Sequence, residues 1–198
     1  MTLDMIKTPD TPACATALEV ATAYCSPALL NHSVRAHVWA AAYGTAQGID
    51  FDPELLYVSA LLHDIGLTPE FDSHTVGFDH AGGHVAWVFA AGAGWPAARR
   101  QRLADVIVAH MANDVDGHAD PEGFLLERST SLDISGRYTD DFSAAFKAEV
   151  LARHPRLGIA EEFLGCFRDQ AERKPTSSAA AAMRGGIGER VLTNALDA

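Results

Sequence analysis

The stretch Ser59–Leu67, SALLHDIGL, places an imidazole and a carboxylate side by side at the inner end of an apolar segment. The segment before the pair, ELLYVSALL (54–62), has the spacing of a buried helical face. The apolar residues in that stripe are Leu55, Val58, Leu61 and Leu62. His63 and Asp64 follow it, and Gly66 predicts a left-handed stop just after them. A polar pair in such a setting needs partners that satisfy both groups.

The rest of the chain carries helical patterns and lacks the alternation of strands. N-cap residues, prolines at first helical positions and apolar stripes recur along it. The expected helices are 12–24, 27–47, 53–62, 80–91, 96–111, 124–136, 140–154 and 159–173. They predict an all-α fold, a helical bundle that forms one domain over residues 1–175. The stretch PTSSAAAAMRGGIGER (175–190) is low in complexity, so the sequence predicts no definite structure for the tail at 176–198.

The composition is that of an ordinary globular chain of 198 residues, with 48% apolar and 21% charged residues. The formal net charge is −11, and no dense block of Lys and Arg reverses it locally. A general nucleic-acid binder would show the opposite balance, because it must attract a polyanion. We therefore expect no nucleic-acid partner.

Cysteine usage and hydropathy predict a cytoplasmic protein. Cys14, Cys25 and Cys166 are far apart and odd in number, which is typical of reduced, buried thiols. The N-terminal residues MTLDMIKTPD lack the basic start and apolar core of a signal peptide. No apolar run approaches the roughly 18 residues that cross a bilayer. We expect no membrane association.

Several histidines and two aspartates lie in apolar helical contexts, on separate predicted helices. These residues are His32, His63, Asp64, His84, His110 and Asp133. A single histidine in an apolar stripe is usually a satisfied core residue, but this combination favours a bound cation that neutralises the acids and occupies the rings. His63 and Asp64 reach one ion if the helix ends there, and His32 and Asp133 complete the ligand set. The remaining positions would hold water or substrate.

Two of these histidines have more than one interpretation. His110 is a further ligand, a proton-transfer residue or a donor behind the ligands. His84 is a ligand to a second ion, together with His110, or a surface residue. The remaining histidines are interpreted as solvated or structural, and they are His37, His74, His80, His118 and His154.

The ordered series of motifs resembles the HD-domain metalloproteins, and within them cyanamide hydratase and its relatives. The matching stretches are NHSVR (31–35) with Trp39 behind it, LLHDIG (61–66), FDHAGG (78–83), IVAHMANDVDG (107–117), LDISG (132–136), HPRLG (154–158) and KPT (174–176). HD alone is a short and weakly specific motif, whereas the ordered series is much more specific. The resemblance extends from about Asn31 to Thr176, most of the chain.

The resemblance implies an all-helical HD fold with a buried divalent ion, usually zinc in this branch. The implied ligands are His32, His63, Asp64 and Asp133, and His110 matches a histidine near the metal. The implied reaction adds water to the nitrile of cyanamide and yields urea. A histidine at position 84 departs from the pattern of this branch and resembles the pattern of HD proteins that bind two metals. The alternatives to a single zinc ion are therefore iron or manganese, and a second ion.

The expected mechanism uses a metal-activated water, with Asp64 or His110 moving the proton. Trp39, Phe71 and Phe78 either make a small dry pocket for a small neutral substrate or simply pack in the core, and for Trp39 core packing is slightly favoured. The protein is also expected to form a homo-oligomer.

Three alternatives stay open at this point. A nucleotide phosphohydrolase of the HD type should carry Lys or Arg near the HD pair to hold phosphate. Residues 55–94 contain neither, although Arg35, Arg99, Arg102 or Arg137 could approach in the fold. A dinuclear-iron HD oxygenase would use His84, and a binding module would have a degraded site. The sequence therefore ranks a cyanamide-type hydratase first.

Overall fold

Helices account for all regular secondary structure in residues 2–197, the part of the chain that the computed structural model describes. The α-helices are α1 Pro12–Tyr24, α2 Pro27–Gln47, α3 Pro53–Leu62, α4 Phe78–Gly92, α5 Ala97–Ala109, α6 Pro121–Ser135, α7 Ala144–Arg153, α8 Ile159–Arg173, α9 Ser178–Arg184 and α10 Ile187–Leu192. The short 3₁₀ turns are η1 Leu3–Met5, η2 Ile65–Leu67, η3 Thr139–Asp141 and η4 Ala195–Asp197. The prediction of an all-α fold is confirmed.

Local capping sets where the first three α-helices begin. The Ser26 hydroxyl accepts the N–H of Leu29 at 3.1 Å, and a carboxylate oxygen of Asp52 accepts the N–H of Leu55 at 3.0 Å. Proline follows each cap, where its missing N–H costs nothing. Gly48 ends α2 with φ of 65°, a left-handed conformation that glycine adopts freely. These signals are local, so the sequence predicted these boundaries closely.

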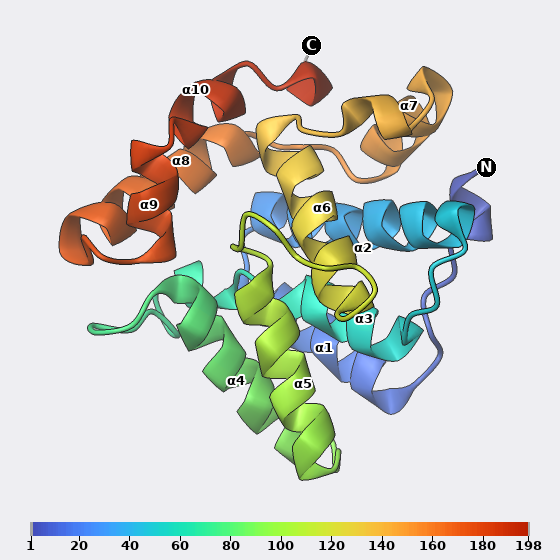
Figure 1. Ribbon diagram of the computed structural model, residues 1–198, viewed down its shortest axis with the longest axis horizontal. Coiled ribbons are helices and arrows are strands. Elements are labelled where there is room, and N and C mark those ends of the chain that lie inside the picture. The colour runs from blue at the N-terminus through green and yellow to red at the C-terminus, as the bar shows by residue number, and fades with distance from the viewer. Residues whose placement is uncertain (1, 198) are drawn as a thin grey trace.

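Helix α2 runs through the middle of the molecule, and α6 crosses it (Figure 1). One apolar cluster joins α1, α3, α4 and α5 to α2, and Leu126 of α6 reaches it. A second cluster joins α8, α9 and α10 to the start of α2, and Phe78 and Ile134 belong to it. Because Ala28 and Leu29 belong to the second cluster and Ala36 to the first, α2 connects the two.

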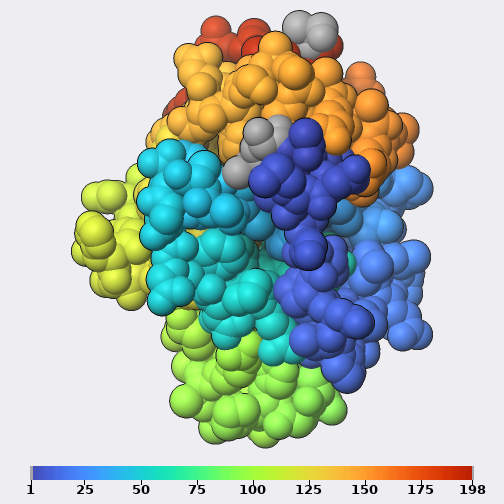
Figure 2. Space-filling model, turned by 90° about the vertical axis from the view of Figure 1, so that its right-hand side faces the viewer, coloured from blue at the N-terminus to red at the C-terminus, as the bar shows by residue number. Residues whose placement is uncertain are grey.

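The N-terminal segment lies on the outer face of the bundle. Leu3 is buried with Phe146 and Val150 of α7, and its N–H donates to a carboxylate oxygen of Glu149 at 3.1 Å. Figure 2 shows this segment, in dark blue, running from the orange α7 region down beside the cyan residues around α3. Within residues 2–197, no helix is both long enough and apolar enough to cross a bilayer.

The C-terminal tail, for which the sequence predicted no definite structure, folds as α9, α10 and η4. Ala179 of α9 and Val191 of α10 are fully buried in the cluster with α8. The KPT motif begins this segment with Lys174, a buried residue whose ammonium donates to Asp72 at 2.7 Å and to Gln170 at 2.8 Å. The tail is therefore part of the fold, and the motif joins it to the loop after η2.

Gly66 does not form the left-handed stop that the sequence predicted. It lies inside η2, and its φ is not positive, unlike that of Gly48 or Gly136. A Cβ on Gly66 would overlap the backbone oxygen of Phe78 and lie 2.9 Å from the backbone nitrogen of Gly82. Gly66 is therefore required because η2 packs directly against the backbone of α4.

Gly66→Ala should lower the free energy of unfolding by about 1–3 kcal/mol, because backbone atoms of α4 cannot move aside as a flexible side chain would. Chemical denaturation of both proteins measures the difference. Gly165→Ala in α8 is the matched control, since a Cβ there meets open space and alanine favours the helix by about 0.5–1 kcal/mol. Equal stability of Gly66→Ala and the wild type would contradict the packing role.

Candidate metal centre

Three buried side chains from two parts of the chain converge at the end of α3. Helix α3 stops at Leu62, and the turn into η2 directs His63 and Asp64 to one point despite their adjacency. His32 reaches the same point from α2. The two imidazole Nε2 atoms lie 3.1 Å apart, and a carboxylate oxygen of Asp64, Oδ2, lies 3.1 Å from Nε2 of His63 and 3.4 Å from Nε2 of His32.

The hydrogen bonds behind the rings determine what faces this point. The Nδ1 of His63 lies 2.8 Å from the carbonyl of Ala60, which can only accept, so Nδ1 carries the proton. The Nδ1 of His32 donates to Asp133 at 2.7 Å. Both Nε2 atoms therefore present lone pairs, and Asp64 Oδ2 has no hydrogen-bond partner. Three acceptors directed at one another repel unless a cation lies among them.

The charge of Asp64 leads to the same conclusion. Within residues 2–197 its only ion-pair neighbours are His32, His63 and His110, and no arginine or lysine is in reach. Burial raises the pKa of Asp64, and in the absence of an ion it is positive charge on His63 and His32 that would outweigh burial and hold this pKa below its usual range. A buried carboxylate without a permanent cation is costly. Two imidazoles and one carboxylate fit a divalent transition-metal ion.

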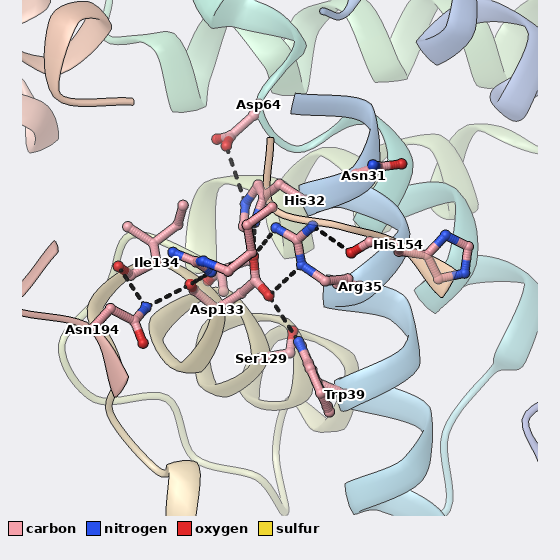
Figure 3. Close-up of polar contacts among 12 residues, drawn as sticks. Asn31, His32, Arg35, Trp39, Asp64, Ser129, Asp133, Ile134, His154 and Asn194 are labelled. Atoms are coloured by element: carbon pink, nitrogen blue, oxygen red, sulfur yellow. Dashed lines mark hydrogen bonds and ion pairs between the residues drawn. The ribbon is translucent and has the colours of Figure 1, made fainter. Parts of the chain in front are cut away.

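Asp133 lies on the opposite side of His32 from Asp64 (Figure 3). Its carboxylate accepts two hydrogen bonds from Arg35, at 2.8 and 2.7 Å, one from the Trp39 indole at 2.9 Å and one from His32. Burial raises the pKa of Asp133, but the Arg35 guanidinium and His32 hold it well below its usual range. In this geometry Asp133 orients His32. This role differs from the prediction that Asp133 is a fourth ligand beside His63 and Asp64.

The residues that hold Asp133 were not predicted from the sequence. Arg35 follows His32 by three residues, a spacing that puts both on one face of α2 and could have indicated the pairing. The backbone oxygen of Asp133 accepts from Arg156 at 2.6 Å and from the amide of Asn194 at 2.8 Å. Arg156 is the arginine of the HPRLG motif, so this motif secures the end of α6. No local pattern predicts Asn194, because its partner is far away in sequence.

His110 lies beside the three converging residues, and His84 does not. His110 is the C-cap of α5, its Nδ1 donates to the carbonyl of Ile107, and its Nε2 lies 3.6 Å from Asp64 Oδ1. Burial and the neighbouring His63 lower the pKa of His110 to about 4, so its ring is neutral near pH 7. His84 is exposed on α4. This position agrees with the surface alternative for His84, and it does not support a second ion held with His110.

A cavity of about 280 Å³ opens from the converging residues. His32, His63, Asp64 and His110 form its inner end. The other lining residues come from the segment after α5, from α6 and from the last helices, and they include Met111, Asn113, Glu127, Thr130, Ser131, Ile134, Arg137, Phe163, Ser178, Ala182, Ile187 and Arg190. The wall that α9 and α10 provide could not be predicted, because the sequence of that tail lacks a clear pattern.

The aromatic residues that the sequence assigned to the pocket do not line this cavity. Trp39 is buried and donates to Asp133, while Phe78 is buried against His110 and Phe167. Phe71 packs against the cluster around α1 and α3. The prediction of an aromatic pocket is therefore wrong, because these rings fill the core around the site.

A family model for the HD domain matches residues 29–138. The chain belongs to the HD domain family. The matched range contains His32, His63, Asp64, His110 and Asp133. Two curated relatives, the cyanamide hydratases DDI2 and DDI3 of Saccharomyces cerevisiae, are each 31% identical to it over 156 residues. The alignments cover 74% of this chain and 67% of each relative. The protein is thus a metal-dependent HD domain enzyme, and the converging residues are a group that could hold a divalent ion.

Asp64→Ala should lose the bound metal and the activity while the helices survive, because Asp64 supplies the only negative charge among the converging ligands. Elemental analysis gives the number of ions per chain, and circular dichroism reports the helices. His84→Ala is the matched control and should keep the wild-type metal content, since His84 is exposed. A fully loaded Asp64→Ala protein would contradict the assigned role.

Arg35→Met should lower the free energy of unfolding by about 3–5 kcal/mol, because it leaves the buried Asp133 carboxylate without its paired cation. Among the arginines and lysines of residues 2–197, only Arg156, 3.7 Å away, would remain paired with that carboxylate. Thermal and urea denaturation measure the loss. Arg153→Met is the surface control, since its pair with Asp4 is exposed and should contribute little. Similar effects of the two substitutions would rule out the proposed importance of the buried pair.

Proposed function

We propose that the protein is a hydratase that adds water to the nitrile of a small neutral substrate, with cyanamide converted to urea. The observation that carries this proposal is the 31% identity to two yeast cyanamide hydratases over 74% of this chain. The site supports it, since buried metal-binding side chains face a cavity of about 280 Å³. In the reaction, the oxygen of water bonds to the nitrile carbon and both of its protons end on the nitrile nitrogen.

We propose zinc as the ion, held by His32, His63 and Asp64. Imidazole and carboxylate ligands suit zinc, and iron or manganese are the alternatives with the same donors. When bound, the ion supplies Lewis acidity and lowers the pKa of a water toward neutrality. Asp133 and the carbonyl of Ala60 fix the ligating tautomers of the two histidines, so that their lone pairs face the ion.

His110 is the residue that we propose to move the proton, with Asp64 beside it. The His110 ring is neutral and lines the cavity. Its Nδ1 donates to the carbonyl of Ile107, which leaves Nε2 available to accept a proton. A neutral imidazole accepts a proton from water and returns it to the nitrile nitrogen as negative charge develops there. The apolar contacts of Ile134 and Phe163 exclude bulk water from part of the same cavity.

Nucleotide phosphohydrolysis is the second candidate, because two arginines line the cavity. Arg137 and Arg190 come from outside residues 55–94, the region in which the sequence shows no basic residue. Arginine is a good ligand for phosphate. Both side chains have other partners, since Arg137 donates to Tyr138 and Arg190 donates to the carbonyl of Gly185. The dinuclear oxygenase alternative has less support, because it needs the exposed His84 near the other ligands.

The zinc-loaded protein should convert cyanamide to urea and release little phosphate from nucleoside mono- and triphosphates. The protein is first stripped with a chelator and then reloaded with zinc, ferrous iron or manganese, and urea and phosphate are measured with each ion. Stripping should abolish the activity, and Asp64→Ala is the inactive control. Rapid phosphate release with no urea formed under any metal would overturn the proposed function.

A further inference from the structure

A second carboxylate, Glu127 on α6, faces the cavity that contains the metal centre. It is only 6% exposed, and it lies outside the group of converging ligand atoms. Helix α6 presents a continuous stripe to the cavity, made of Glu127, Thr130, Ser131 and Ile134. This spacing of three and four residues keeps them on one face of the helix. Neither the metal site nor the proton transfer described above uses Glu127.

The carboxylate of Glu127 is only partly satisfied by the protein. Its Oε1 accepts from the hydroxyl of Ser131 at 2.9 Å and lies 3.5 Å from a guanidinium nitrogen of Arg137. Within residues 2–197, no hydrogen bond reaches Oε2. Arg137 is a loose partner, because its guanidinium stacks on the Tyr138 ring at 4.7 Å and its side chain is 42% exposed. One oxygen of a buried carboxylate is therefore free to accept a donor from the cavity.

The electrostatics of Glu127 favour such a donor. Burial raises the pKa of Glu127, and the Ser131 hydroxyl and the nearby Arg137 and Arg128 compensate only in part. The carboxylate has lost water that its protein neighbours do not fully replace. An N–H group brought by a ligand restores a charge-assisted hydrogen bond, which is stronger than one between neutral groups.

We propose that Glu127 is a specificity-determining residue, whose Oε2 binds an N–H group of the substrate while the nitrile carbon faces His32, His63 and Asp64. This inference rests on the proposed hydratase function and names its substrate class, nitriles that carry an amino group. Cyanamide is the shortest such nitrile, and aminoacetonitrile is one carbon longer. Nitriles of the same shape with a methyl group in place of the amino group give Glu127 no donor, so the site selects against them.

Isosteric pairs of nitriles test this selection. Cyanamide is compared with acetonitrile, and aminoacetonitrile with propionitrile, in the wild type and in Glu127→Gln. The variant should raise KM about tenfold for the amino-bearing members, because a charge-assisted hydrogen bond becomes a neutral one. It should leave kcat within about threefold, and it should leave both parameters of the methyl-bearing members nearly unchanged. Each substrate is compared with itself, so intrinsic reactivity cancels.

Glu122→Gln is the matched control for loss of a buried carboxylate on α6. Glu122 is also 6% exposed, but it pairs with Arg102 and accepts the N–H of Asp52, outside the cavity. This control should lower stability without changing the preference within either pair of nitriles. An equal loss for amino- and methyl-bearing substrates in Glu127→Gln, or a fall in kcat alone, would overturn the assignment of Glu127.

Equilibrium binding separates this inference from the proposed function. Saturation-transfer NMR measures the binding of urea, which has N–H donors, and of acetone, its isostere without them. Weaker binding of urea to Glu127→Gln with acetone unchanged supports the role of Glu127, even if the wild type hydrates no nitrile and the proposed function fails. The opposite result is that the wild type hydrates nitriles but binds urea and acetone alike, and that Glu127→Gln binds both as the wild type does. That result would keep the proposed function and refute the inference.

Discussion

The ion pair between Arg35 and Asp133 is the constraint on which the metal site depends. Both side chains are fully buried, and the guanidinium donates to both carboxylate oxygens. Because this carboxylate is fixed, the Nδ1 proton of His32 has a fixed acceptor, and the Nε2 lone pair must face Asp64. The geometry of the site is thus set by a pair of charges that does not line the cavity. The pair also joins α2 to α6, the two helices that cross at the centre.

The site contains three buried carboxylates, and each is neutralised in a different way. Asp133 has a permanent cation in Arg35. Within the described residues Asp64 pairs only with histidines, an arrangement that a bound ion would neutralise. Glu127 has the Ser131 hydroxyl and a guanidinium nitrogen of Arg137 at 3.5 Å, both on Oε1, which leaves Oε2 for a ligand. Since an unpaired buried charge is costly, this series runs from a structural residue, through the candidate metal ligand, to the proposed substrate-binding residue.

The sequence predicted what local signals determine, namely the helices with their caps and the histidines and aspartates in apolar surroundings. It failed where a contact joins distant segments. Gly66 has a glycine's usual sequence signature of a helix stop, yet its role depends on the backbone of α4. The wall formed by α9 and α10 folds because α8 covers its alanines, a tertiary effect that overrides the weak local pattern. The position of Asp133 behind His32 likewise depends on Arg35. The sequence therefore indicated that Asp133 belongs to the site but not which residues it contacts.

The two faces of α6 have a consequence for how such a site can diverge. One face carries Asp133, which contacts His32. The neighbouring face carries Glu127 and Ser131, which line the cavity. Any change that turns or shifts this helix disturbs the contact of Asp133 with His32 and the position of Glu127 in the cavity together, so α6 should tolerate little drift. The opposite wall, from Ser178 to Arg190, supplies no atom to the ligands. Substitutions there reshape the cavity without touching the ion, which makes α9 and α10 the natural place for new substrate preferences to evolve and for an engineer to begin.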